Sequence, residues 1–404
     1  MSLKIGVISP QDWGLARAAT APDPLPGLNL TAAELEQRIH ACTYQWAQHF
    51  DQEAGAFYGF YSAPEQRFEA PQTVNLIAPW LLLAAYDHYQ DAELLRQAER
   101  ATDWFYRHFV VTHPMSVVIG GVRESLPEGE LWTKFAAEFV LLSAGLYTRT
   151  NKALYRERAE QSAMFLIQSE RHGFAPKYDT RLSEWRAKGW QSFGRVIEAL
   201  LMLAEVTDDQ AWQARALKWG DYGLTLLAAD GGLYLIDDEY FNTDIAADEL
   251  RAFTFLYELT GRADFLNAAE RFAGWLMKHV RQDGAWPLTI DRDGNVVVPT
   301  VGPGDIPNIA IAFLRLHHIT KTPEYMAVTL KALHYSVTVQ VLPGSDQPYS
   351  DDPNVQWGFW SWMPPYDYTV SGDQATHHVR GFLFLLDYIG QFGREDGAAH
   401  LPGE

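Results

Sequence analysis

The chain has 404 residues, of which 47% are hydrophobic and 21% are charged, a composition typical of a globular protein with a large core. Its formal net charge of −19 argues against nucleic acid as a partner, because contacts to phosphates need clustered Lys and Arg. No apolar stretch is long enough to span a membrane, the first residues do not form a secretory signal, and Cys42 is the only cysteine. We therefore expect a cytoplasmic protein with no membrane contact, no disulfide and no cysteine-rich metal site.

Helical periodicity dominates the sequence and predicts twelve helices. Start signals such as Thr322 followed by Pro323 support several boundaries, and Pro79 must start, kink or break the second helix. In chain order, the predicted helices are residues 31–50, 73–90, 91–110, 131–149, 151–169, 189–206, 208–227, 243–260, 262–281, 305–320, 322–340 and 373–391.

The odd-numbered helices from the third onward share a repeat, in which a large apolar residue is followed by two small residues and an aromatic one. The first copy is Leu94, Ala98, Thr102 and Trp104, and further copies start at Tyr155, Trp212, Phe265 and Tyr325. These helices have a charged face, whereas the even-numbered helices are apolar nearly all round, which places the odd-numbered helices outside. Six hairpins of this kind predict an all-α fold, an (α/α)6 barrel. The barrel domain is predicted over residues 31–392, between an N-terminal extension (1–30) and a C-terminal tail (393–404).

Connection lengths indicate which end of the barrel carries function. Connections after even-numbered helices are short, whereas those before them run to about 15–30 residues, which is unusual inside a compact domain. The long connections are rich in aromatic residues and contain segments expected to form short β-strands or turns. We therefore expect the substrate site at the N-termini of the inner helices. Aromatic side chains suited to stacking on a sugar ring there are Trp190, Tyr240, Trp357, Trp360 and Trp362.

Carboxylates near the starts of the inner helices are the candidates for acid–base chemistry. They are Glu138, Glu198, Asp244, Asp248, Glu249, Asp305 and Asp373. Glycoside hydrolysis needs two carboxyl groups, one protonated and one ionised. Helix capping already explains an Asp at a helix start, whereas Asp248 and Glu249 lie past the first turn. An intrahelical ion pair with Arg251 is the structural alternative for Asp248. We predict Asp248, Glu249 and Asp373 as catalytic and Glu138 as a substrate contact.

The last inner helix begins with SGDQATHHVRG, which brings polar groups into an otherwise apolar helix. His377 and His378 are adjacent and point about 100° apart on a helix, so at most one of them faces the lumen. His378 is predicted to act as an acid or base, and Arg380 to hold a carboxylate or hydroxyl group of the substrate. The acidic runs at 237–239 and 351–352 lack EF-hand spacing, and nucleotide-binding and zinc motifs are absent from the sequence. No metal and no cofactor are expected.

From about residue 30 to 392 the chain resembles the six-hairpin glycosidase superfamily. The resemblance lies in the helical repeat and in the phrase AADELRAFTFLYELTGRADFLNAAERFAGWLMKH with DGAWP behind it. The chain looks most like the unsaturated glucuronyl and rhamnogalacturonyl hydrolases, which implies an aspartate acid or base on the inner helices. It is also similar to the N-acylglucosamine 2-epimerase group, whose last inner helix carries a His followed by an Arg, as His378 and Arg380 do here. That group implies a second His on an earlier inner helix, where this chain has Asp248 and Glu249.

The sequence therefore favours a glycoside hydrolase acting on a short oligosaccharide, including one that contains a uronic acid. Two alternatives stay open. One is a sugar epimerase or isomerase that uses His378, and the other is a barrel that binds sugars without catalysis. In each case the expected partner is a small carbohydrate, and the sequence leaves open whether the chain forms homo-oligomers.

Overall fold

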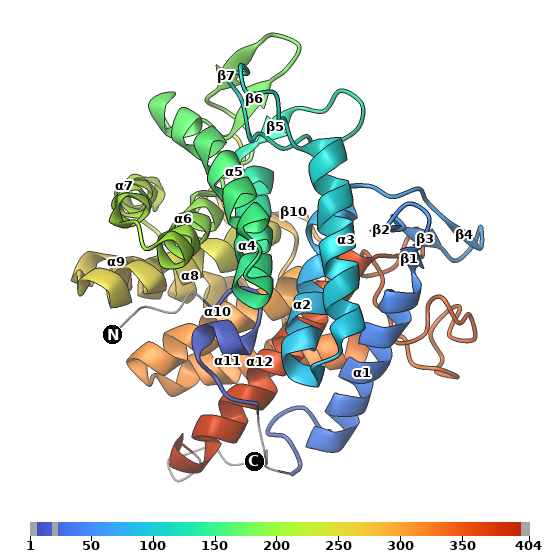
Figure 1. Ribbon diagram of the computed structural model, residues 1–404. Coiled ribbons are helices and arrows are strands. Elements are labelled where there is room, and N and C mark those ends of the chain that lie inside the picture. Colours follow the sequence, from blue (N-terminus) through green and yellow to red (C-terminus); the bar gives the residue numbers. More distant parts are fainter. Residues whose placement is uncertain (1–5, 18–22, 397–404) are drawn as a thin grey trace.

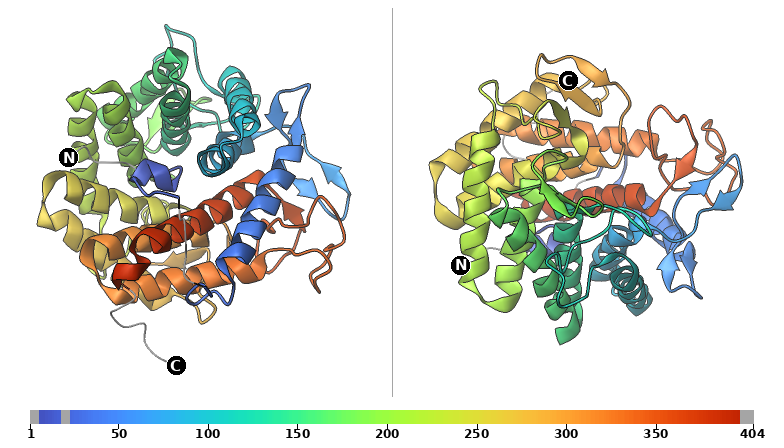
Figure 2. Two further views of the ribbon diagram at one scale, coloured as in Figure 1. Left: turned by 60° about the horizontal axis from the view of Figure 1, so that its bottom comes forward. Right: turned by 90° about the horizontal axis from the view of Figure 1, so that it is seen from above.

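The computed structural model describes residues 6–17 and 23–396, and within them twelve α-helices confirm the predicted helical hairpins. Figure 1 shows the helices with their labels, and Figure 2 shows the ring that they form from two further directions. The outer helices are α1 (Ala32–Gln48), α3 (Ala92–Phe109), α5 (Ala153–Arg171), α7 (Gln210–Leu226), α9 (Ala263–His279) and α11 (Pro323–Val339). The inner helices are α2 (Ala78–Tyr89), α4 (Thr133–Thr150), α6 (Phe193–Thr207), α8 (Thr243–Thr260), α10 (Asp305–Thr320) and α12 (Gly372–Asp396).

The inner helices contact one another in chain order, and α12 packs against α2, which closes the ring. Each inner helix from α2 to α10 packs on the outer helix that follows it, whereas α12 pairs with α1 from the other end of the chain. The fold is therefore the predicted (α/α)6 barrel. None of the helices in the described part of the chain is long and apolar enough to cross a membrane.

Two-residue connections reverse the chain after each inner helix from α2 to α10. The first residue of each connection has a left-handed φ between +54° and +68°, which ends the helix within one residue. These residues are Gln90, Asn151, Asp208, Gly261 and Lys321. The long connections consequently gather at the opposite end, at the N-termini of the inner helices, as the sequence predicts.

Short strands join neighbouring long connections around that end of the barrel. Three-stranded antiparallel sheets have the strand orders β11–β3–β4, β5–β6–β7 and β8–β9–β10, and β1 pairs with β2. The strands are β1 (Phe50–Asp51), β2 (Ala56–Phe57), β3 (Tyr61–Ser62), β4 (Arg67–Phe68), β5 (Leu131–Trp132), β6 (Lys177–Asp179), β7 (Glu184–Arg186), β8 (Tyr240–Asn242), β9 (Thr289–Asp291), β10 (Val296–Val298) and β11 (Thr369–Val370). Because β5 and β8 run directly into α4 and α8, these sheets fix the first residues of those inner helices.

The small residues of the repeat lie where outer helices meet the inner ring. Ala98, Ala159, Ala216 and Ala269 are all fully buried. A methyl side chain at these positions lets two helices approach closely, which is why the small residues recur at helical spacing. Most of the repeat aromatics are also buried, so they serve packing rather than ligand binding.

A segment before α1 lies against the other end of the barrel, where the inner helices end. It contains the 3-10 helix η1 (Pro10–Trp13), which Figure 2, left, shows in dark blue within the ring of helices. A second 3-10 helix, η2 (Thr73–Leu76), leads into α2.

Candidate active site

A line of polar side chains crosses the end of the barrel where the inner helices start. Lys134 in the first turn of α4 forms an ion pair with Asp244 in the first turn of α8, although α6 separates these helices in the ring. The neighbouring hydroxyl of Thr243 donates a hydrogen bond of 2.5 Å to a carboxyl oxygen of Asp305, at the start of α10. Three inner helices are therefore connected through their first turns.

The first turn of α12 extends this line. The side-chain nitrogen of Gln374 donates a hydrogen bond to Asp373 at 3.2 Å. Its side-chain oxygen accepts a hydrogen bond of 2.6 Å from the backbone N–H of Gly304, the residue before α10. Side chains of Asp244 and Asp373 keep 32% and 40% of their surface accessible to solvent. A ligand that enters this end of the barrel can therefore reach carboxyl groups from α8 and α12.

Two carboxyl groups of this line have pKa values shifted in opposite directions. Enclosure by protein and the charge of Asp244 raise the pKa of Asp305 well above its ordinary value. Enclosure also acts to raise the pKa of Asp373, but the hydrogen bond and charge of His377, together with Lys134 and Gln374, outweigh it, and the pKa of Asp373 is lowered. These opposite shifts favour the protonated form of Asp305 and the ionised form of Asp373, a combination that suits one group as acid and the other as base.

Hydrogen bonds determine the tautomer of His377, one turn after Asp373. Arg380 has only donors, so the Asn308 oxygen, 3.1 Å from its guanidinium, accepts a hydrogen bond. The Asn308 amide nitrogen is then left to donate to Nδ1 of His377 at 2.8 Å. The imidazole proton must therefore sit on Nε2, which lies 3.3 Å from the Asp373 carboxylate. Burial lowers the pKa of His377, so it is a neutral donor that holds Asp373 in its ionised form.

A buried ion cluster lies deeper between α6 and α8. Arg195 contacts Asp248 at 2.8 Å and Glu198 at 3.0 Å, and Arg251 contacts the same two carboxylates at 2.9 Å and 2.7 Å. All four side chains are almost completely buried. Burial raises the pKa of Asp248 to about 6 against the opposing effect of Arg195. The ion pair with Arg251, considered from the sequence as a structural alternative, is thus formed, and we do not retain Asp248 as a catalytic group.

Glu249 has a structural contact that sequence reasoning missed. Its carboxyl oxygen accepts the backbone N–H of Gly194, in the first turn of α6, at 2.6 Å, while the Ser192 side chain before that helix makes no capping bond. The side chain is fully buried, and burial raises its pKa well above the ordinary value. Glu249 therefore caps α6 from the neighbouring helix, away from solvent. This placement removes it from our set of catalytic candidates.

The two histidines of α12 point in different directions. His378 stacks on Phe359 with ring centroids 3.6 Å apart, is fully buried, and has no hydrogen bond to either ring nitrogen within the described part of the chain. It is His377 that lies beside Asp373. The i, i+4 spacing of Asp373 and His377 was the sequence signal for this pair. We therefore replace His378 by His377 in the candidate site.

The other predicted substrate contacts are spread over several environments. Arg380 is fully buried and donates to the backbone carbonyl of Ile8 at 3.0 Å, so its guanidinium is used inside the barrel. Trp360 is 1% exposed and packs edge-on against Tyr368. Three others, Tyr240, Trp357 and Trp362, are half-buried in the long connections.

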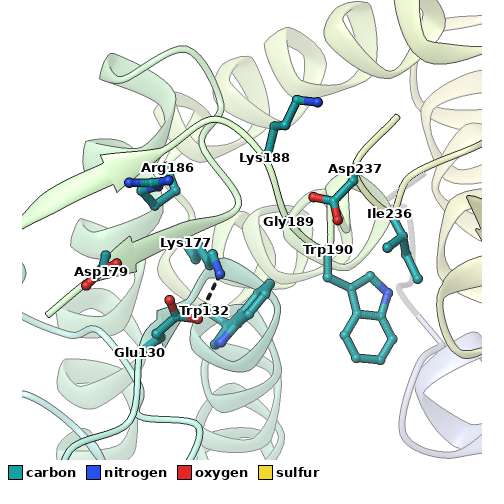
Figure 3. A pocket seen from close by; sticks show the side chains of 10 residues that line it. All are labelled: Glu130, Trp132, Lys177, Asp179, Arg186, Lys188, Gly189, Trp190, Ile236 and Asp237. Carbon is teal, nitrogen blue, oxygen red and sulfur yellow. Dashed lines mark hydrogen bonds and ion pairs between the residues drawn. The ribbon is translucent and has the colours of Figure 1, made fainter. Parts of the chain in front are cut away.

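A pocket of about 480 Å³ opens beside the polar line (Figure 3). Trp190 lines this pocket and also contacts the polar line, because the ammonium of Lys134 lies 4.7 Å from the centre of the Trp190 ring. Trp132, which sequence reasoning missed, has Lys177 at the same distance. A Cβ at Gly189, whose φ is +141°, would lie in ordinary contact with the Trp132 ring at 3.4 Å, so a larger side chain at this position would cover part of the ring. The lining residues are Glu130, Trp132, Lys177, Asp179, Arg186, Lys188, Gly189, Trp190, Ile236 and Asp237.

Among the residues that the structure describes, no group of three or more His, Cys, Asp or Glu side chains is arranged to hold a metal ion. The cations nearest the candidate site are instead protein side chains, Lys134 and Arg195.

Comparisons with known proteins establish the fold. Scans against models of protein families and against curated proteins give no match. Among solved structures, a D-mannose isomerase superposes with a TM-score of 0.72 at 14% identity, over 88% of this chain and 97% of that one. Cellobiose 2-epimerase from Bacillus thermoamylovorans gives 0.71 at 14% identity, over 89% and 99%. Unsaturated glucuronyl hydrolase from Bacillus sp. GL1 gives 0.64 at 12% identity, over 86% and 96%. The resemblance to both groups named from the sequence is thus confirmed for the six-hairpin fold.

Proposed function

We propose that this chain is a carbohydrate-active enzyme, and that it isomerises or epimerises a reducing sugar by moving a proton at the carbon next to the carbonyl. The observation that carries this proposal is the pair formed by Asp305 and Asp373, whose pKa values are shifted apart at the solvent-accessible end of the barrel. The similarity of fold to D-mannose isomerase and cellobiose 2-epimerase supports the same reaction class.

The reaction would start with the ionised carboxylate of Asp373 taking the proton from the carbon beside the carbonyl. Protonated Asp305 would give its proton to the carbonyl oxygen, which forms an enediol and leaves a carboxylate on α10. To give the isomer, Asp373 would return the proton to the former carbonyl carbon while the Asp305 carboxylate takes the proton from the hydroxyl on the neighbouring carbon, which becomes the new carbonyl. To give the epimer, solvent water would deliver a proton to the opposite face of the first carbon and take up the proton held by Asp373, while Asp305 takes its own proton back from the original carbonyl oxygen. His377, as a neutral donor, keeps Asp373 ionised before the first step.

The ammonium of Lys134 favours this assignment over glycoside hydrolysis. Negative charge develops on oxygen as an enediol forms, and a fixed cation beside the site stabilises it. Glycoside hydrolysis passes through a transition state that resembles an oxocarbenium ion, which a nearby cation disfavours. The pKa of Lys134 is raised because Asp244 and Glu138 outweigh the effect of burial, so this side chain stays charged.

A glycoside hydrolase is the second candidate, because the same two carboxyl groups meet its requirement. Protonated Asp305 would assist the leaving oxygen, and ionised Asp373 would act as base or nucleophile. The similarity of fold to unsaturated glucuronyl hydrolase supports this alternative.

The test is to incubate the protein in D₂O with reducing sugars and, separately, with neutral and unsaturated uronyl glycosides, and to follow products by NMR. We expect deuterium at the carbon next to the carbonyl together with a new ketose or epimer. Variants Asp305→Asn and Asp373→Asn should lose this activity, whereas Glu249→Gln, which alters a buried carboxyl away from solvent, should keep it. Release of a new reducing end without deuterium at carbon would favour hydrolysis. Thermal stabilisation by sugars without any product would contradict both reactions and favour a binding protein.

A further inference from the structure

We propose that residues 6–15, here called the N-terminal plug, position the Asp373–His377 pair through Arg380 and Asn308. The plug closes the end of the barrel opposite the candidate site, and its backbone carbonyls fix the guanidinium that in turn determines the tautomer of His377. This inference rests on the proposed function only in that His377 and Asp373 take part in the chemistry.

The plug is inserted between inner helices rather than lying on the surface. Ile8 is fully buried, and a Cβ at Gly145 of α4 would come within 2.4 Å of its Cδ1. A glycine at this point of an inner helix therefore makes room for the Ile8 side chain.

Charged and aromatic contacts hold the plug in place. Arg149, in the last turn of α4, lies 3.0 Å from Asp12 of the plug and also pairs with Asp87 of α2. The ring of Trp13 stacks on Tyr388 of α12, with ring centroids 6.0 Å apart and planes inclined by 17°. The Ser9 hydroxyl of the plug also donates to Asp87 at 2.6 Å, so the plug contacts α2, α4 and α12.

Arg380 connects the plug to the site. Its Nε donates to the carbonyl of Ile8 at 3.0 Å, and Nη2 donates to the carbonyl of Val7. The third nitrogen, Nη1, lies 3.1 Å from the Asn308 oxygen and 3.2 Å from Nδ1 of His377. A guanidinium is planar, so two carbonyls on one edge fix where the remaining N–H groups point.

Loss of this guanidinium orientation would free the Asn308 amide. If the amide turned over, its oxygen would face Nδ1 of His377, and the imidazole proton would move to that nitrogen. Nε2 would then have no proton to donate to Asp373. The plug carbonyls therefore select the tautomer that keeps Asp373 ionised, from the opposite end of the barrel.

A compensating pair of substitutions tests the inference. Gly145→Ala places a methyl group against Ile8 and should displace the plug, whereas Gly145→Ala combined with Ile8→Ala removes the clash and keeps the backbone carbonyls. The measurement is the ¹⁵N spectrum of the histidine side chains, assigned for His377 by His377→Gln. We expect an Nε2-protonated His377 in the wild type and in the double variant, and a mixture of tautomers in Gly145→Ala. With a substrate in hand, kcat of Gly145→Ala should fall roughly 10- to 100-fold with a shifted pH profile and little change in KM.

Arg380→Lys provides a second variant if Gly145→Ala does not fold. A single ammonium cannot hold two carbonyls and orient the Asn308 amide as a guanidinium does, so the same mixture of tautomers is expected. An unchanged His377 tautomer in Arg380→Lys would overturn the inference. So would an unchanged tautomer in a folded Gly145→Ala whose Val7 and Ile8 amide signals show that the plug has moved. If the tautomer follows the plug but no sugar is converted by the wild type, the inference stands and the proposed function fails.

Discussion

Glu138 gives the most quantitative prediction, because its carboxyl is buried and its two cationic neighbours lie beyond hydrogen-bonding distance. Its side chain is 5% accessible, with Lys134 at 3.9 Å and Arg195 at 3.7 Å. Burial raises the pKa of Glu138 to about 7, although both cations act to lower it. We predict that Glu138→Gln, which keeps the shape and removes the ionisation, stabilises the protein at neutral pH.

The size of the effect follows from the pKa difference. A rise from 4.5 to about 7 is about 2.5 units, which corresponds to about 3.5 kcal/mol at roughly 1.4 kcal/mol per unit. Because the pKa is higher in the folded state, the contribution of Glu138 to stability is complete below pH 4.5 and is lost as the pH rises to about 7. The stability of Glu138→Gln relative to the wild type should therefore increase across this window and stay constant above it.

Urea denaturation of both proteins between about pH 4 and pH 8 measures this difference directly. Glu34→Gln is the matched control with the opposite sign. A hydrogen bond from the backbone of Thr31 lowers the pKa of Glu34, so there the wild type loses stability relative to the variant as the pH falls below the ordinary range. A stability difference for Glu138→Gln that does not change with pH would refute the reasoning.

Three further predictions concern the site and its surroundings. Asp373→Asn should lower sugar turnover about 100-fold or more and lower the pKa of His377 in an NMR titration, because the Asp373 carboxylate raises that pKa; an unchanged His377 titration would argue against the pair. Glu249→Ala should lose at least about 1 kcal/mol of unfolding free energy through the lost cap on Gly194, whereas Glu249→Gln keeps an acceptor and should lose less; equal losses in urea denaturation would contradict the capping role. Gly189→Val should raise KM without lowering kcat for sugars that reach the pocket. A KM equal to that of the wild type for every sugar tested would exclude the pocket from binding.

Much of the fold could be predicted from the sequence, because its signals are local. Small residues such as Ala98 and Ala159 recur at helical spacing and are fully buried in the barrel. Two-residue connections begin with left-handed residues at fixed places, for example at Asn151 and Gly261. Since connection length alone decides at which end the loops gather, the sequence also identified the end that carries the polar line.

The roles of single side chains at that end could not be predicted, because they depend on the phase of each helix in the ring. Adjacent residues on a helix point about 100° apart, so His377 faces Asp373 while His378 stacks on Phe359. Asp248 and Glu249 differ in the same way, one facing the ion cluster and the other Gly194 of the next helix. The sequence gives the spacing of these residues but not the rotation of the helix that carries them.

Arg380 explains why the two ends of the barrel are coupled. Arg195 and Arg251 each have a carboxylate partner within 3 Å. Arg380 differs from them, because the groups that it contacts in the plug are backbone carbonyls. Burial, followed by the charge of the neighbouring Arg251, lowers its pKa to about 9. A buried cation stays charged only while its donors are satisfied, so removing the plug carbonyls destabilises the charge as well as its orientation. The end of the barrel without access to the candidate site is therefore part of the site's electrostatics.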